Sequence, residues 1–71
     1  MLTSQTMTLA MLLDVLDQNL IVTIVKVEDD KRTFICSKVL KYVLADLDSY
    51  LDNEVRRIEA GGSYRIGIEL Y

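Results

Sequence analysis

Residues 20–27 read LIVTIVKV, and this stretch decides the fold. β-branched residues dominate it and leave it apolar on nearly both faces, which predicts a central strand covered on one side by a helix. The charged residues EDDK at 28–31 follow and predict a turn. Strand character resumes at residues 33–37, so the two segments together predict an antiparallel hairpin.

A helix is predicted before this strand. Four leucines fall at the spacing i, i+3, i+4 and i+7, which is one stripe of a helix: Leu9, Leu12, Leu13 and Leu16. Thr8 or Thr6 is a suitable N-cap, and Asn19 is a suitable stop. Residues 1–6 are polar and unpatterned, so we interpret them as a frayed leader.

A second helix is predicted over residues 37–51. Its apolar residues follow helical spacing: Leu40, Val43, Leu44, Leu47 and Leu51. Ser37 would be the N-cap, and Asp52 with Asn53 would end the helix. The Val and Tyr content also fits an extended start, so residues 37–46 are open to either interpretation.

A second hairpin is predicted from residues 55–60 and 64–70, around two glycines at 61 and 62. A two-residue loop would set Ile58 opposite Arg65 and mix apolar with charged residues. A three-residue loop with a glycine bulge instead pairs Ala60 with Tyr64 and Ile58 with Ile66, which keeps one face apolar. We therefore predict an odd-length loop.

The predicted register divides the last hairpin into two faces. Four residues would face the core: Tyr64, Ile66, Ile68 and Leu70. The other face would carry Arg57, Glu59, Arg65, Gly67, Glu69 and Tyr71. The predicted architecture is a small single α+β domain over residues 1–71, in the order α-β-β-α-β-β, with a four-stranded, mainly antiparallel sheet. An unpaired sheet edge offers a route to a homo-oligomer by strand addition.

Composition narrows the classes of function. The chain has 71 residues, 11 acidic and 8 basic, with a net charge of −3, which argues against a general nucleic-acid surface. Cys36 is the only cysteine, so no internal disulfide is expected and a cytoplasmic location is the default. The longest apolar run is far too short to span a membrane, and we expect no membrane association.

The chemistry of catalysis is sparse. The chain contains no His, the commonest general base and metal ligand. Cys36 lies within a predicted strand, where a free cysteine is usually a small core residue. The clustered carboxylates lack the spacing of a calcium loop. We therefore predict no enzyme, no catalytic residue, no metal and no cofactor.

One constellation suggests ligand binding. Arg57, Arg65 and Tyr71 share the outward face of the last hairpin, and Gly67 would leave a flat patch beside them. Guanidinium groups near an aromatic ring can hold a phosphate and stack a base. Glu59 and Glu69 share that face, however, and ion pairing explains the arginines without a ligand.

Two stretches resemble small phage and prophage proteins of Gram-positive bacteria: TLAMLLDVLDQNLIVTIVKVEDD at 8–30 and YLDNEVRRIEAGGSYRIGIEL at 50–70. Residues 39–50 depart from that pattern, because they are longer and more helical than the short connection expected there. The resemblance implies a non-enzymatic binding protein that neutralises an anti-phage defence factor in the host cell. It would block a defence protein or sequester a signalling nucleotide between subunits. The alternative is a structural, self-assembly or protein-docking module without a small-molecule ligand.

Overall fold

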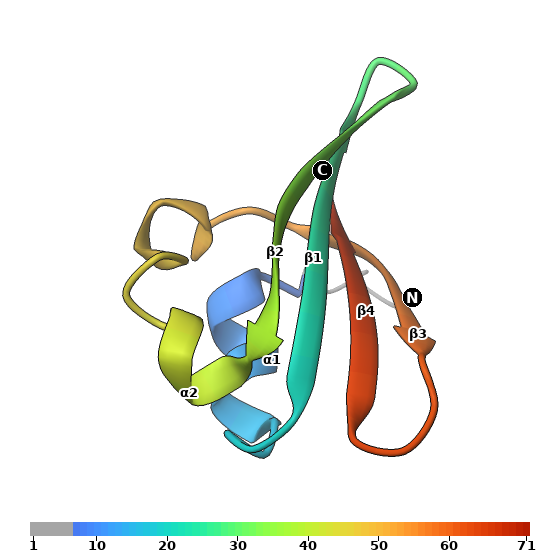
Figure 1. The fold of residues 1–71 in the computed structure, drawn as a ribbon. Coiled ribbons are helices and arrows are strands. Elements are labelled where there is room, and N and C mark those ends of the chain that lie inside the picture. The colour runs from blue at the N-terminus through green and yellow to red at the C-terminus, as the bar shows by residue number, and fades with distance from the viewer. Residues whose placement is uncertain (1–6) are drawn as a thin grey trace, which may run out of the picture.

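The computed structural model describes residues 7–71 and shows a four-stranded sheet with its helical segments on one face (Figure 1). The order of elements confirms the predicted small α+β fold. The prediction of a frayed leader, and of Thr6 as a cap, lies outside the described residues. In chain order the elements are α1 (Leu9–Val15), β1 (Ile21–Glu28), β2 (Lys31–Val39), α2 (Leu40–Val43), the 3-10 turn η1 (Asp48–Tyr50), β3 (Val55–Ala60) and β4 (Arg65–Leu70).

Two antiparallel hairpins lie side by side in the sheet, in the strand order β2-β1-β4-β3. One strand of each hairpin occupies the centre, and these two strands, β1 and β4, run parallel. Two of the three pairings are antiparallel, so the predicted mainly antiparallel sheet is confirmed. β2 and β3 form the two edges.

The hydrophobic core lies between the sheet and the helical layer. It consists of nine buried residues drawn from both layers: Leu9, Leu12, Val22, Ile24, Leu40, Val43, Leu47, Ile68 and Leu70. Alternate residues of the two central strands supply the sheet side of the core, as the period of two in a strand requires. The other set of alternate residues forms the opposite face, which no helix of residues 7–71 covers (Figure 1).

The first helix begins as predicted and ends early. The Thr8 hydroxyl accepts a hydrogen bond from the Met11 amide at 3.3 Å and caps α1. The amides of Leu9 and Ala10 donate to backbone carbonyls of residues 53 and 51, so the connection before β3 completes the cap. The helix ends at Val15 rather than near Asn19.

The first hairpin is confirmed and is longer than predicted. Asp29 and Asp30 both have positive φ, 49° and 66°, which is the geometry of a tight two-residue hairpin turn. Ile24 pairs with Cys36 and Val25 pairs with Phe34, so Ile35 between them has no partner. Ile35 therefore forms a β-bulge in the edge strand.

The predicted helix over residues 37–51 is wrong in extent. β2 continues through Ser37 to Val39, α2 is a single turn, and η1 adds one 3-10 turn. Ser37 is not an N-cap, because its hydroxyl is hydrogen bonded at 2.9 Å to the hydroxyl of Thr23 on the neighbouring strand.

The connection between β2 and β3 explains this difference. It must cross the helical side of the sheet from one edge strand to the other. After α2 it winds tightly, because the amides of Leu47, Asp48 and Tyr50 each donate to the carbonyl three residues earlier. Asp and Ser compete for backbone hydrogen bonds and favour such turns over a continuous helix. The helical spacing nevertheless identified the buried residues of this segment, since three of its five members belong to the core.

The last hairpin confirms the odd-length loop and corrects the register. Three residues, 62–64, form the loop, and the Gly61 amide donates to the Arg65 carbonyl at 3.1 Å. Ile58 pairs with Ile68, not with Ile66, so the register is shifted by two residues. Tyr64 was predicted in the core, but it lies in the loop at φ 60° and is 73% exposed. An even shift keeps the two faces, so Ile66, Ile68 and Leu70 still point to the core side.

Leu47 offers a test of the connection's role in stability. We expect Leu47→Ala to lower the free energy of unfolding by about 2–5 kcal/mol, because it empties a fully buried site. That is a large share of the roughly 4–10 kcal/mol available to a domain of this size. Urea unfolding followed by circular dichroism measures the loss. Leu44→Ala is the control: Leu44 is 39% exposed, so this substitution should lower the free energy of unfolding far less. Equal losses for the two variants would contradict the placement of Leu47 in the core.

Candidate functional site

The uncovered face of the sheet is the surface on which the sequence placed a binding site. Its side chains come from alternate positions of all four strands and include Thr23, Val25, Phe34, Arg57, Glu59, Arg65, Gly67 and Glu69. Phe34 is 64% exposed, which is a large exposure for an aromatic side chain on a sheet. We call this surface the open face.

The four residues predicted as a ligand site are not gathered at one point. Arg65 and Tyr71 stand at the start and just beyond the end of β4, so about 20 Å of strand separates their Cα atoms. Arg57 Nε lies 2.8 Å from Glu59 Oε1, which is the alternative ion pairing considered from the sequence. Tyr71 is 57% exposed, and its backbone bonds to Glu54 and Asn53.

Gly67 lies in the middle of the open face and leaves a shallow depression of about 60 Å³. Thr23, Val25, Arg32 and Glu59 surround it. A Cβ placed on Gly67 would meet only Glu59 atoms, at 3.8 Å or more, which is ordinary contact. The flat patch predicted at this glycine is therefore present, and a larger side chain has room there.

An ion-pair cluster crosses the open face beside this depression. Glu69 on β4 accepts hydrogen bonds from Arg32 of β2 at 2.9 Å and from Arg56 of β3 at 2.5 Å. The Glu69 side chain is only 10% exposed. The hydrogen bond from Arg32, with a smaller contribution from Arg56, holds the pKa of Glu69 below its ordinary value.

Arg32 and Arg56 were not among the residues predicted as a ligand site, although Arg56 belongs with Arg57 and Arg65 to a local cluster of basic residues in the sequence. Arg32 reaches Glu69 across β1, and that contact requires the strand order β2-β1-β4. Arg56 sits at an irregularity between the pairs Val55–Leu70 and Arg57–Glu69. Neither feature has a signal in a single sequence, so only the presence of Glu69 among several arginines could have suggested the pairing.

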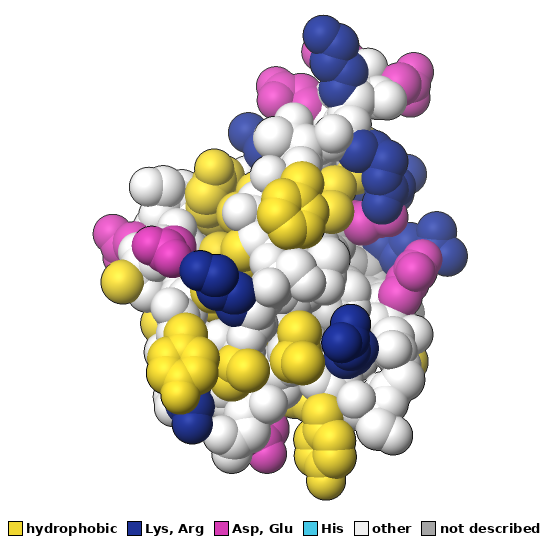
Figure 2. Space-filling model, viewed as in Figure 1, with side chains coloured by type: hydrophobic (Ala, Val, Ile, Leu, Met, Phe, Trp, Pro, Cys, Tyr) yellow, Lys and Arg dark blue, Asp and Glu magenta, His cyan; other side chains and the backbone are white. Residues whose placement is uncertain are grey.

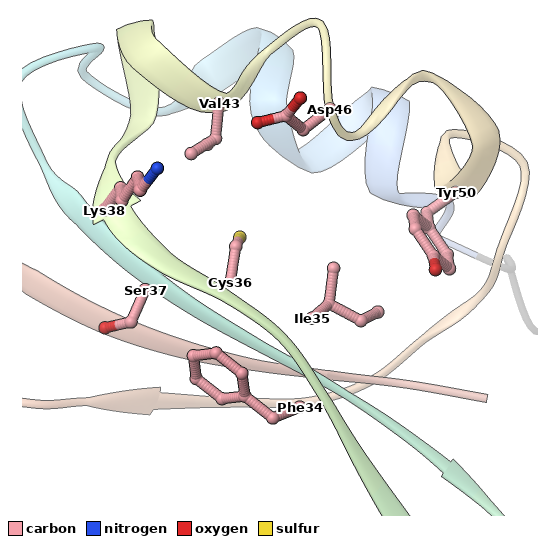
Figure 3. Close-up of a pocket in the computed structure, with 8 residues that line it drawn as sticks. All are labelled: Phe34, Ile35, Cys36, Ser37, Lys38, Val43, Asp46 and Tyr50. Carbon is pink, nitrogen blue, oxygen red and sulfur yellow. The ribbon is translucent and has the colours of Figure 1, made fainter.

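A second concave feature follows the free edge of β2. It is a groove of about 340 Å³, bounded by residues 34–38 of β2 on one side and by Val43, Asp46 and Tyr50 of the helical layer on the other (Figure 3). Ile35, Cys36 and Lys38 point toward the helical layer, whereas Phe34 and Ser37 point to the opposite side of the strand (Figure 3). We call this feature the edge groove.

Cys36 lies on the floor of the edge groove and is half-buried. Burial is the main cause that raises the pKa of its thiol, and the nearby carboxylate of Asp46 raises it further. A raised pKa keeps the thiol neutral near pH 7, whereas a nucleophilic cysteine needs a lowered one. Cys36 therefore behaves as part of an apolar floor.

Charge is unevenly distributed over the surface. Figure 2 shows hydrophobic side chains separated by Lys and Arg on the side of the sheet, with acidic side chains at the tip of the first hairpin and over the helical connection. The open face carries four arginines, Arg32, Arg56, Arg57 and Arg65, against two glutamates. It is therefore locally positive on a chain of net charge −3.

Within residues 7–71, no three metal-ligating side chains lie close enough together to hold an ion. No helix of that part of the chain is long and apolar enough to cross a membrane. Comparisons with protein-family models, with curated proteins and with solved structures gave no match. The candidate functional surfaces therefore rest on this structure's own geometry.

Glu69 should make stability depend on pH. Its pKa is lower in the folded state, so its ionised form stabilises the fold above the ordinary pKa of a glutamate, and that contribution is lost as the pH falls through the lowered value. We expect acidification from pH 7 to 3 to destabilise the wild type more than Glu69→Gln, as measured by urea unfolding. Glu28→Gln, at the exposed hairpin tip, should behave like the wild type; parallel pH profiles for all three proteins would refute the role of Glu69.

Cys36 should react slowly with thiol reagents. Because its pKa is raised and it is half-buried, we expect iodoacetamide at pH 8 to alkylate it more slowly than a cysteine in a short peptide. Mass spectrometry over time gives the rate. Adding urea should bring the rate to that of the peptide, and a native rate equal to or above the peptide's would show that the thiol is activated.

Proposed function

We propose that the protein is a non-enzymatic binding protein that docks through the open face on a partner protein and blocks it. The partner that the resemblance to phage proteins favours is an anti-phage defence protein in the host cytoplasm. The observation that carries the proposal is an uncovered sheet face with an exposed aromatic side chain, a central depression at Gly67 and a local excess of arginine.

These features suit a protein partner. Protein interfaces are enriched in aromatic residues and Arg and depleted in Lys, Glu and Asp. Both glutamates of the open face, Glu59 and Glu69, are paired with arginines. Phe34 supplies an exposed aromatic group beside Val25, which lines the depression, and Arg57 and Arg65 supply charge elsewhere on the open face. The positive charge of this face favours an acidic surface on the partner and steers the encounter. Binding should therefore weaken as the salt concentration rises.

Blocking a protein is better supported than sequestering a nucleotide. Small-molecule sites usually enclose about 300–1,000 Å³, whereas the depression at Gly67 offers about 60 Å³. The arginines and Tyr71 do not converge there. The edge groove is larger, but of its two charged lining residues one is Lys38 and the other is the carboxylate of Asp46, which would repel a phosphate.

Gly67→Val tests the docking surface without harming the fold. Gly in a strand interior costs about 0.5–1 kcal/mol relative to Ala, and Val favours strands, so the variant should be at least as stable as the wild type. The added methyl groups would fill the depression. In bacteria that express the protein and carry an anti-phage defence system which it inhibits, we expect Gly67→Val to restore the block on phage plating.

Gly67→Ala is the matched control, because it gives the same backbone benefit with one methyl group and should keep most of the inhibition. Tyr42→Ala, at an exposed residue of α2 away from the open face, should keep all of it. A stable Gly67→Val protein with full inhibitory activity would exclude the open face as the docking surface. A retained nucleotide in native mass spectrometry of the wild type would favour sequestration instead.

A further inference from the structure

We propose that the edge groove binds an extended, acidic peptide segment of a partner protein, which adds to β2 as a fifth strand. This site meets the open face at Phe34 and Arg32, but it lies along the edge of β2 and does not depend on the proposed function. The combination of an edge strand with a groove beside it is the geometry used when peptides bind by strand addition. Four observations, on the edge, the groove, the bulge and the charges, lead to this assignment.

The edge itself supplies the backbone groups. β2 pairs with β1 on one side only, and among residues 7–71 no other strand pairs with it. Backbone amides and carbonyls on the free side of an edge strand are available to a further strand. β3, at the opposite edge, is less open at its beginning, because the Val55 amide already donates to the Met7 carbonyl at 2.7 Å.

The groove supplies the specificity for side chains. Successive side chains of an added strand would point alternately to the two faces of the sheet. One set would enter the groove of about 340 Å³, where Ile35, Cys36 and the facing Val43 form an apolar part between the charged residues Lys38 and Asp46. The other set would lie beside Phe34, whose exposed ring lacks a cross-strand neighbour on its free side.

The bulge shapes this site. Because Ile35 is the extra residue, both Ile35 and the adjacent Cys36 point toward the helical layer, which widens the apolar floor (Figure 3). A bulge also interrupts the regular ladder for any strand added to this edge, so we expect the peptide to pair regularly with β2 on one side of Ile35 only.

Charge selects the partner. β2 carries three cations, Lys31, Arg32 and Lys38, and no acidic residue. Two copies of β2 placed edge to edge would bring six cations together, so a second copy is disfavoured. An acidic strand is favoured for the same reason. The carboxylate of Asp46 lines the groove and would repel a second carboxylate there, so the groove side of the peptide should be apolar and its carboxylates should lie on the side of Phe34 and Arg32.

The test uses a fluorescein-labelled peptide of sequence EVEVEV, whose two faces are acidic and apolar, and KVKVKV as its charge-reversed control. Fluorescence anisotropy gives the affinity. We expect binding of EVEVEV and at least about tenfold weaker binding of KVKVKV. Lys38→Glu should reduce the affinity for EVEVEV by about tenfold or more, whereas Lys41→Glu, the same charge change on α2 outside the groove, should leave it within about twofold.

Cys36 reports where the peptide binds. Bound EVEVEV should slow iodoacetamide alkylation of Cys36 and slow amide hydrogen exchange in β2, while Gly67→Val on the open face should not change either effect. Three results would overturn the proposal: no binding at millimolar peptide, protection of β3 and β4 instead of β2, or protection of Cys36 by the protein alone as its concentration rises. The last result would identify a second copy as the occupant.

Discussion

β1 and β4 run side by side in parallel, and their pairing holds the two halves of the chain together. Val22 lies beside Ile66 and Ile24 beside Ile68, so each central strand presents a row of apolar residues to the same helical layer. Without this pairing each hairpin would be an isolated two-stranded unit, which is at best marginally stable in water. The parallel pairing also places β2 and β3 at the two edges of the sheet. It therefore determines which strands have backbone amides and carbonyls without a partner strand on one side.

The strand order has a second effect, on the connection over residues 40–54. This segment must pass from one edge of the sheet to the other, and it does so on the side that α1 occupies. Both helical segments therefore lie on one face, and nothing else in the described part of the chain, residues 7–71, covers the opposite face. The open face and the edge groove both follow from this arrangement: the first is the uncovered side, and the second is the gap between the edge strand and the start of the crossing segment.

The parts of the fold that sequence predicted are those controlled by local pattern. Spacing located α1, the β-branched residues located β1, and trial pairing of the last two strands located their apolar face. Prediction from sequence failed where contacts between distant segments determine the local structure. The segment after Val39 has the apolar spacing of a helix, but its path across the sheet breaks it into turns. The register of the last hairpin depends on Gly62 at φ 106°, and either of two adjacent glycines could have opened the loop. Of the residues predicted as a ligand site, Gly67 lies at a shallow depression of the open face, and Arg65 and Tyr71 lie at opposite ends of β4.

The pairing of β1 with β4 also has a consequence for how the chain is made. Ile21 pairs with Arg65 in the sheet. More than forty further residues must therefore be synthesised before β4, the second neighbour of β1, can form. During that interval the apolar stretch at 20–27 has only β2 beside it, and contacts between segments so distant in sequence form slowly. Unpaired strands exposed in this way are prone to aggregation. Until β4 is made, the exposed apolar edge is therefore the β4 side of β1, and the cations and the bulge, which lie on β2, do not shield it.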